Sequence, residues 1–168
     1  SSASCSAMCA NPFSPQSPSS VQCPLRSRLI ACSQLSPDTS TRGHVPTGDS
    51  VMIGGFAVSG EGPQQVLILA RGPSLADAGV PNTLPNPRVT LVNQVTGLIE
   101  ASNDDWGSAS NAAAIAATGK QPTRAVESAI LATLSPGNYT AVVDGGPSGG
   151  TGNGIVEVFE IDQPETPL

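Results

Sequence analysis

Short runs of apolar and β-branched residues, separated by turn-forming residues about every eight to fifteen positions, follow one another from about residue 38 onward. This spacing is typical of an all-β chain. Alternation of apolar and polar side chains is clearest in segments 139–143 and 155–161. The pattern predicts strands over residues 50–59, 65–71, 88–93, 97–102, 126–134, 138–144 and 155–161, with a further strand at 28–32.

One segment between these strands favours a helix. Residues 110–118 begin with a Ser/Asn pair suited to an N-cap and continue mostly as alanine, and Gly119 is expected to end the helix. A tight turn is predicted at 135–138, where Ser, Pro, Gly and Asn follow one another. Seven or eight short antiparallel strands with one short helix in a crossover connection predict an antiparallel β-sandwich of jelly-roll type.

The first 37 residues are a different kind of chain. They contain eleven Ser, five Pro and all four Cys, but only two charged residues, Arg26 and Arg28. They hold too little hydrophobic material to offset the entropy of ordering the backbone, roughly 1–2 kcal/mol per residue. We therefore expect an extended arm over 1–37, a sandwich domain over 38–162 and a C-terminal tail over 163–168.

The four cysteines are even in number and lie in the segment that a hydrophobic core cannot hold: Cys5, Cys9, Cys23 and Cys32. We interpret them as disulfide-forming. A metal site is the alternative, but the first gap is C-x-x-x-C and the only histidine lies twelve residues past the last cysteine. Free thiols are the third possibility. Four cysteines allow three intrachain pairings, and bridges between chains are equally open.

Charge and hydropathy narrow the range of partners. The chain of 168 residues carries a net charge of −6 and a single lysine, so it has no basic stripe for nucleic acid. Its longest aliphatic runs, such as 66–70, are far shorter than the roughly 20 residues of a membrane span. Disulfides imply an exported protein. The uncharged start indicates a mature chain after cleavage of a signal peptide, which predicts an extracellular or cell-surface location.

A succession of short motifs carries a family resemblance. In order they are VLILARGPSL at 66–75, VTLV at 89–92, GLI at 97–99, NDDWG at 103–107, ESAI at 127–130, LSPGNYTAVV at 134–143, TG at 151–152 and VEVF at 156–159. Residues of about 40–162 thereby resemble an uncharacterised β-rich domain common at the C-terminal end of secreted bacterial proteins. They are similar, more weakly, to pre-peptidase C-terminal domains. The resemblance implies export and a non-catalytic accessory or structural role.

Clustered side-chain oxygens at 103–105 suggest a calcium site. Asn103, Asp104 and Asp105 offer the hard oxygen ligands that Ca²⁺ prefers, and Glu127 or Asp144 could add a carboxylate. In pre-peptidase C-terminal domains an Asn-Asp pair after a strand can contribute to such a site, but the resemblance by itself does not identify a ligand. The alternative is that these residues cap a turn. No cofactor is required by the sequence, and Ca²⁺ is the one candidate.

Two further side chains are interpreted as structural. Arg71 ends an apolar strand, and we expect its guanidinium to pair with Asp104, Asp105 or Glu127. Trp106, the only tryptophan, is expected to fill a gap in the core, with a sugar-stacking platform as the alternative.

Little in the sequence supports catalysis. His44 lies in a turn-rich segment without a nucleophile motif, and we expect it to be a surface histidine. Asp104 and Asp105 are adjacent, so on an extended backbone they point in opposite directions. The glycine-rich stretch 144–154 is expected to be a flexible hairpin loop. Asn138 begins a glycosylation sequon. We expect a protein that is not an enzyme.

The leading hypothesis is an extracellular structural subunit that self-assembles into a filament or surface layer. In it, the N-terminal arm packs on a neighbouring copy by strand addition, and disulfides lock the join. The alternative is a monomeric secreted accessory module that binds carbohydrate or a cell-envelope polymer. A secreted enzyme inhibitor is a third possibility.

Overall fold

A computed structural model describes residues 28–34, 38–46 and 51–161. Within these ranges the chain forms nine strands, one α-helix and two 3-10 helices. In chain order they are β1 (Arg28–Gln34), β2 (Asp38–Val45), β3 (Met52–Val58), β4 (Gln64–Arg71), η1 (Pro73–Ala78), β5 (Arg88–Asn93), β6 (Ile99–Asn103), η2 (Trp106–Ser108), α1 (Ala112–Ala117), β7 (Ser128–Leu134), β8 (Gly137–Asp144) and β9 (Gly152–Glu160).

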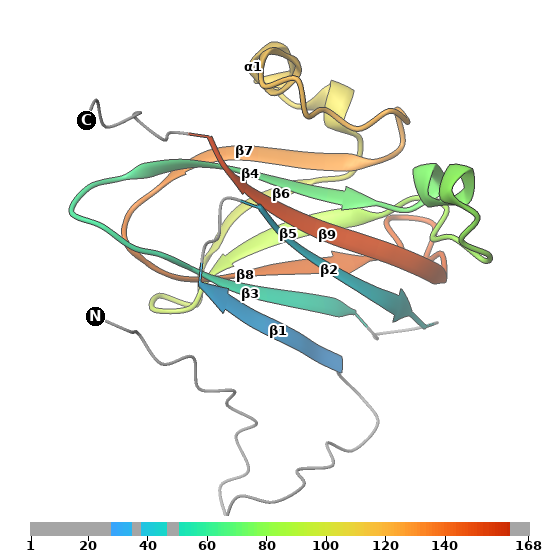
Figure 1. Ribbon diagram of the computed structural model, residues 1–168, viewed down its shortest axis with the longest axis horizontal. Helices are drawn as coiled ribbons and strands as arrows, with labels where there is room; N and C mark the ends of the chain where they lie inside the picture. The colour runs from blue at the N-terminus through green and yellow to red at the C-terminus, as the bar shows by residue number, and fades with distance from the viewer. Residues whose placement is uncertain (1–27, 35–37, 47–50, 162–168) are drawn as a thin grey trace, which may run out of the picture.

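The strands form two packed sheets (Figure 1). Sheet A has the order β1-β3-β8-β5-β6, and sheet B has the order β2-β9-β4-β7. Strands β2 to β9 pass between the sheets in the manner of a jelly roll, which confirms the expected all-β sandwich. Every pair is antiparallel except β1 and β3, which are parallel. The chain reverses once in β2 on the other sheet before it enters β3, so β1 and β3 run in the same direction.

The main core lies between the two sheets. Strands β3, β8 and β9 alternate between buried and half-buried residues, as expected for strands with one face on a core. The inward side chains include Met52, Phe56, Leu91, Val143 and Val156. Strand β4 differs, because five consecutive residues, 66–70, are buried. Both of its faces are therefore covered.

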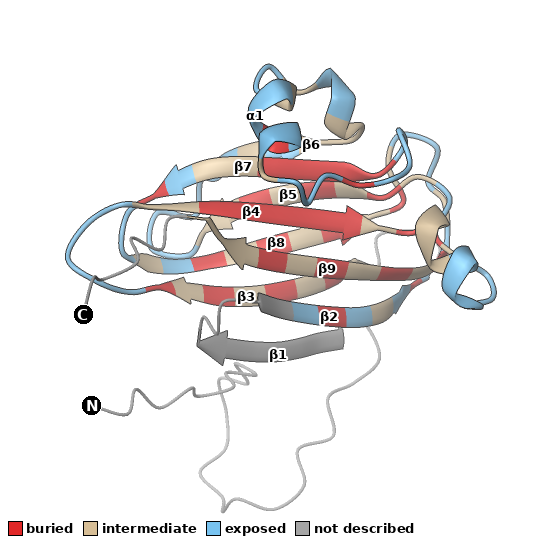
Figure 2. Cartoon of the chain, turned by 45° about the horizontal axis from the view of Figure 1, so that its top comes forward, coloured by how far each residue is buried: buried red, intermediate tan, exposed pale blue. Residues whose placement is uncertain are grey.

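A second, smaller core covers the outer face of sheet B. Leu67, Leu69 and Ala129 point outward from β4 and β7 and pack with Ile115 of α1. Trp106 packs against the same cluster and is half-buried. The expectation that Trp106 fills a core is thus confirmed. Figure 2 shows the segment that carries α1 lying above β7 and β4.

Helix α1 is shorter than predicted and is not capped as predicted. Gly119, with a φ of 71°, lies just beyond its C-cap and confirms the expected stop. The N-cap residue Asn111 makes no side-chain cap hydrogen bond. Its amide Nδ2 donates to the carbonyl oxygen of Leu131 at 2.9 Å instead. None of the helices in the described ranges is long and apolar enough to cross a membrane.

The predicted strands are all present, β5 with its predicted ends and the others with one or both ends shifted by a few residues. Strand β2 was missed, because the segment 38–45 contains turn-forming and charged residues and no apolar alternation. It forms as an edge strand through main-chain pairing with β9. The 3-10 helix η1 was also missed.

Two of the connections that cross between the sheets were predicted as turns or loops. The tight turn at 135–138 leads from β7 to β8, and the Tyr139 hydroxyl donates to the carbonyl oxygen of Ser135 at 2.8 Å. The Tyr139 ring stacks on Phe56 with centroids 5.7 Å apart. The glycine-rich stretch leads from β8 to β9, which lie in different sheets. The expectation of a hairpin there was therefore wrong.

Candidate functional site

The predicted polar residues gather at one end of the sandwich, which we call the loop end. Strands β4, β6 and β8 finish there, and β5, β7 and β9 begin there. Asn103 ends β6, Asp104 and Asp105 follow it, and Glu127 precedes β7. The structure thus brings all four predicted calcium ligands to the same end, but their side chains have different partners.

Glu127 is fully buried, at 0% exposure, and ties two segments together. Its Oε1 accepts hydrogen bonds from the Gly72 N–H at 3.0 Å, the Ser74 N–H at 2.9 Å and the Ser74 hydroxyl at 2.6 Å. Its own carbonyl oxygen accepts the Trp106 N–H at 2.9 Å. Glu127 therefore holds the segment after β4 and the start of η2 against the start of β7.

Asn103 accepts a hydrogen bond from the main chain of strand β7, which is one of the two edge strands of sheet B. Its Oδ1 accepts the Ala129 N–H at 3.0 Å, and its Nδ2 donates to the Asp105 carbonyl oxygen at 3.1 Å. Asn111 donates to Leu131 on the same strand. Because unpaired groups on an edge strand invite another strand, these two asparagines protect the β7 edge from strand addition.

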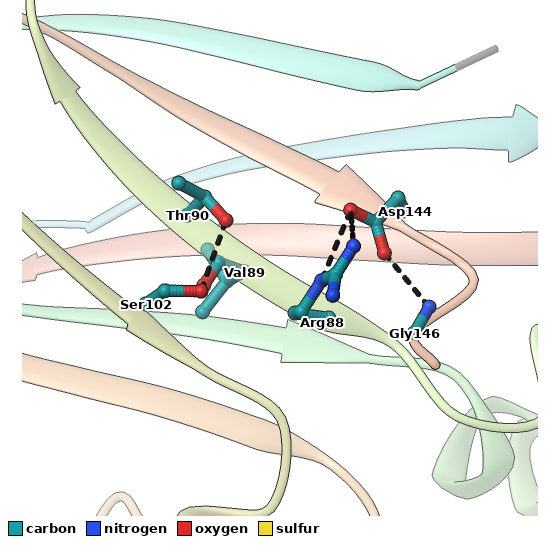
Figure 3. Close-up of polar contacts among 6 residues, drawn as sticks. All are labelled: Arg88, Val89, Thr90, Ser102, Asp144 and Gly146. Carbon is teal, nitrogen blue, oxygen red and sulfur yellow. Dashed lines mark hydrogen bonds and ion pairs between the residues drawn. The ribbon is translucent and has the colours of Figure 1, made fainter. Parts of the chain in front are cut away.

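An ion pair between Arg88 of β5 and Asp144 of β8 joins these strands at the loop end. The Asp144 Oδ2 accepts hydrogen bonds from Nε and Nη2 of Arg88, at 3.2 and 2.9 Å (Figure 3). The Asp144 Oδ1 accepts the Gly146 N–H at 2.8 Å. The hydrogen bond with Asp144 raises the pKa of Arg88. Asp144 is therefore already engaged by a cation and by the loop that follows it.

Asp104 has an oxygen without a partner. Its Oδ1 is buried and accepts no hydrogen bond from the described residues, and the same holds for Oδ1 of Asn86. Burial, together with the charges of Asp105 and Asp144, raises the pKa of Asp104. The polar side chain of Asn86 and the charge of Arg88 lower the pKa of Asp104 and partly oppose the rise.

The calcium site stays a prediction. Asn103 and Glu127 each use a side-chain oxygen to accept main-chain N–H groups, so Asp104 and Asp105 are the two members of the set not held in this way. Across residues 28–34, 38–46 and 51–161, no group of three or more His, Cys, Asp or Glu side chains is placed to hold a metal ion. Asn86, which sequence reasoning missed, also acts on the Asp104 carboxylate.

Replacement Asp104→Asn is expected to change how stability depends on pH. Because the folded state raises the pKa of Asp104 above 3.8, the folded protein binds the proton more tightly than the unfolded chain. The free energy of unfolding of the wild type should therefore fall as the pH rises from about 3.8 through the raised pKa of Asp104. The variant should lack that loss. Denaturant unfolding at about pH 3 and about pH 7, with a chelator present, measures the difference. Exposed Glu61→Gln is the control. An equal pH dependence in wild type and Asp104→Asn would contradict the prediction.

Arg71 pairs with a carboxylate other than those predicted. Its Nε lies 2.9 Å from Oε2 of Glu157 on β9. Arg71 faces Ile155 across the β4–β9 pair, and Glu157 is two residues further along, on the same side of sheet B. The expected pairing with Asp104, Asp105 or Glu127 was wrong, because sequence alone does not give the register of β4 against β9.

A shallow depression of about 370 Å³ lies beside β2, open to solvent. Arg42, Asn153 and residues 78–81 line it. The Asn153 Nδ2 donates to the Pro81 carbonyl oxygen at 2.7 Å, and its Oδ1 lies 3.2 Å from Nδ1 of His44. His44 is exposed, as predicted.

The remaining predicted sites lie largely outside the described residues. The described residues do not include Cys5, Cys9, Cys23 or the tail 163–168, whereas Cys32 belongs to β1. The disulfide prediction is therefore untested. Asn138 is exposed near the start of β8, where a glycan would be accessible.

Comparison with known proteins gives a weak likeness in fold to solved structures. No protein-family model matches the chain, and no curated protein matches it in sequence. A solved structure, the pre-peptidase C-terminal domain of a collagenase from Bacillus anthracis, is similar with a TM-score of 0.45 and 14% identity. The match covers 78% of this chain and 97% of that domain. Pre-peptidase C-terminal domains are the class of domain to which the sequence motifs are weakly similar.

Proposed function

We propose that this protein is an extracellular structural subunit that self-assembles, with its N-terminal arm supplying a strand to a neighbouring copy. The observation that carries the proposal is strand β1. It belongs to the Cys-rich arm, and it pairs with the outer edge of β3 in sheet A. The eight strands β2 to β9 already make a jelly roll without it.

The pairing of β1 with β3 is made between main-chain groups and does not require the two strands to belong to the same copy. Arg28 pairs with Met52 and Gln34 with Ala57, through main-chain groups. The β1 strand of a second copy presents the same groups in the same direction. Exchange of β1 between copies therefore preserves the pairing, which is the basis of domain swapping and of donor-strand assembly.

The other edges of the jelly roll are protected against strand addition. Asn103 and Asn111 cap β7, as described above. Strand β6 has an irregular register against β5, so that Glu100 has no partner residue opposite it. Strand β2 carries Arg42 and His44, both exposed. Protected edges elsewhere favour the β3 edge as the acceptor.

The cysteine positions fit the same proposal. Cys32 lies within β1, so a disulfide from Cys32 would tie the added strand covalently to its surroundings. Such a bond requires an oxidising compartment, which supports an extracellular location.

The test is the oligomeric state of the full chain under oxidising conditions. We expect polymers by electron microscopy and light scattering, and we expect excess peptide of residues 28–34 with Cys32→Ser to shorten them by occupying the β3 edge. Ser33→Pro should block assembly, because proline removes a main-chain donor from β1. Ser20→Pro, outside any described strand, is the matched control. A monodisperse monomer at every concentration would overturn the proposal and favour the accessory module that binds a polymer.

A further inference from the structure

Exposed aliphatic side chains concentrate at the tip between β5 and β6. In the described part of the chain four large hydrophobic residues are exposed, and three of them fall within five positions. Val95 is 78% exposed, Leu98 65% and Ile99 67%. Single exposed aliphatic residues are ordinary, but a cluster of this kind marks an interaction surface. We call Val95, Leu98 and Ile99 the apolar tip.

The loop that carries the apolar tip is ordered by its own hydrogen bonds. The Asn93 Oδ1 accepts the Val95 N–H at 2.9 Å, and the Asn93 N–H donates to the Leu98 carbonyl oxygen at 2.9 Å. The Asn93 Nδ2 donates to Oε1 of Glu100 at 3.0 Å, so the nearest carboxylate is engaged. Gly97 supplies the positive φ of 71° that the turn requires. The polar groups are thus satisfied inside the loop, and the aliphatic side chains are held toward solvent.

The apolar tip and the start of β1 lie at opposite ends of sheet A. The first residue of β1, Arg28, pairs with Met52, and Met52 pairs with Val143 near the loop end. The last residue of β1, Gln34, pairs with Ala57, which pairs with Asn138. The Asn138 carbonyl oxygen accepts the N–H of Gln94, the first residue of the tip loop. Residues 1–27 therefore join the sandwich at the end away from the tip.

Length and composition of the arm suit it to cover the tip of another copy. Twenty-seven residues span up to about 90 Å when extended, whereas the longest strand, β9, spans about 30 Å. In a head-to-tail row, the arm joined to the loop end of one copy meets the tip end of the next. Residues 1–27 carry one charge, Arg26, and include Met8, Phe13, Val21 and Leu25.

We infer that the apolar tip is the docking surface for residues 1–27 of an adjacent copy. This inference rests on the proposed self-assembly and names its second contact, separate from the β3 edge. Burial of three aliphatic side chains against a segment with a single charge supplies the driving force.

The test combines a binding assay and an assembly assay on the full chain. A peptide of residues 1–27, with its cysteines replaced by serine, should bind the chain and should bind the triple variant Val95→Ser, Leu98→Ser, Ile99→Thr at least about tenfold more weakly. The same variant should assemble less. Val126→Ser, which removes the fourth exposed aliphatic side chain, is the control and should behave like wild type.

A photo-reactive side chain at exposed position 94 then identifies the occupant. In a mixture of isotopically light and heavy chains, cross-links from position 94 to residues 1–27 should join light to heavy chains. Cross-links within single chains only would overturn the inference, and so would unchanged peptide binding by the triple variant. If wild type assembles and the triple variant assembles equally, the inference fails while the proposed function stands. A wild type that never assembles contradicts the proposed function itself.

Discussion

Replacement Glu127→Ala is expected to lower the free energy of unfolding by about 3–4 kcal/mol. The substitution removes the acceptor of the Gly72 and Ser74 N–H groups and of the Ser74 hydroxyl, in a site with 0% exposure. Each buried donor left without an acceptor costs about 1–3 kcal/mol. Since small domains are stable by about 5–15 kcal/mol, this loss is a large share of the total. Denaturant unfolding followed by circular dichroism measures it.

Two further variants separate hydrogen bonding from the loss of a side chain. Glu127→Gln keeps a carbonyl oxygen as an acceptor and should cost less than Glu127→Ala. Glu61→Gln removes an exposed carboxylate and should change stability by less than about 0.5 kcal/mol. If Glu127→Ala also changes stability by less than about 1 kcal/mol, the buried carboxylate does not hold the loop end together.

The variant Gly72→Ala is expected to lower the free energy of unfolding by at least about 3 kcal/mol. A Cβ at position 72 would lie 2.0 Å from the carbonyl oxygen of Leu84 and 2.9 Å from its carbonyl carbon. These are main-chain atoms, so the backbone itself must move. The φ of Gly72 is −142°, outside the left-handed region that favours glycine, so the expected loss is argued from the close approach. Thermal and denaturant unfolding measure it.

Gly62→Ala is the matched control for this prediction. A Cβ at Gly62 meets nothing within 4 Å, so alanine there should leave stability unchanged or raise it by about 0.4–1 kcal/mol through a lower entropy of the unfolded chain. Equal effects of the two substitutions would contradict the steric explanation.

The alternation of apolar and polar residues was enough to locate the strands that have one face on the core and a less buried face on the other side. Strands β8 and β9 follow it closely, and β5 was predicted with its observed ends. Strand β2 has no such pattern, because its place depends on main-chain pairing with β9 and not on its own side chains. The parallel pairing of β1 with β3 could not be predicted for the same reason, because the local sequence does not determine which edge a distant strand joins.

The candidate site was predictable in its residues but not in their partners. Asn103 and Glu127 were singled out for their oxygens, and both do accept hydrogen bonds. Their donors, on Ala129 and Gly72, are 26 and 55 residues away in the chain. Which atoms meet across such separations depends on strand register, and register is fixed by the packing of both sheets. The same reason explains why Arg71 pairs with Glu157.

The direction of β1 also determines how a polymer built in this way would respond to tension. A pull on residue 27 away from the loop end acts along β1, while the rest of the subunit is held at its tip end. The hydrogen bonds between β1 and β3 run across that direction, on both sides of a register shift between Leu29 and Cys32. They would be loaded together in shear instead of opening one after another. A fibre joined by such strands should therefore resist stretching far better than it resists the peeling of a single strand from its edge.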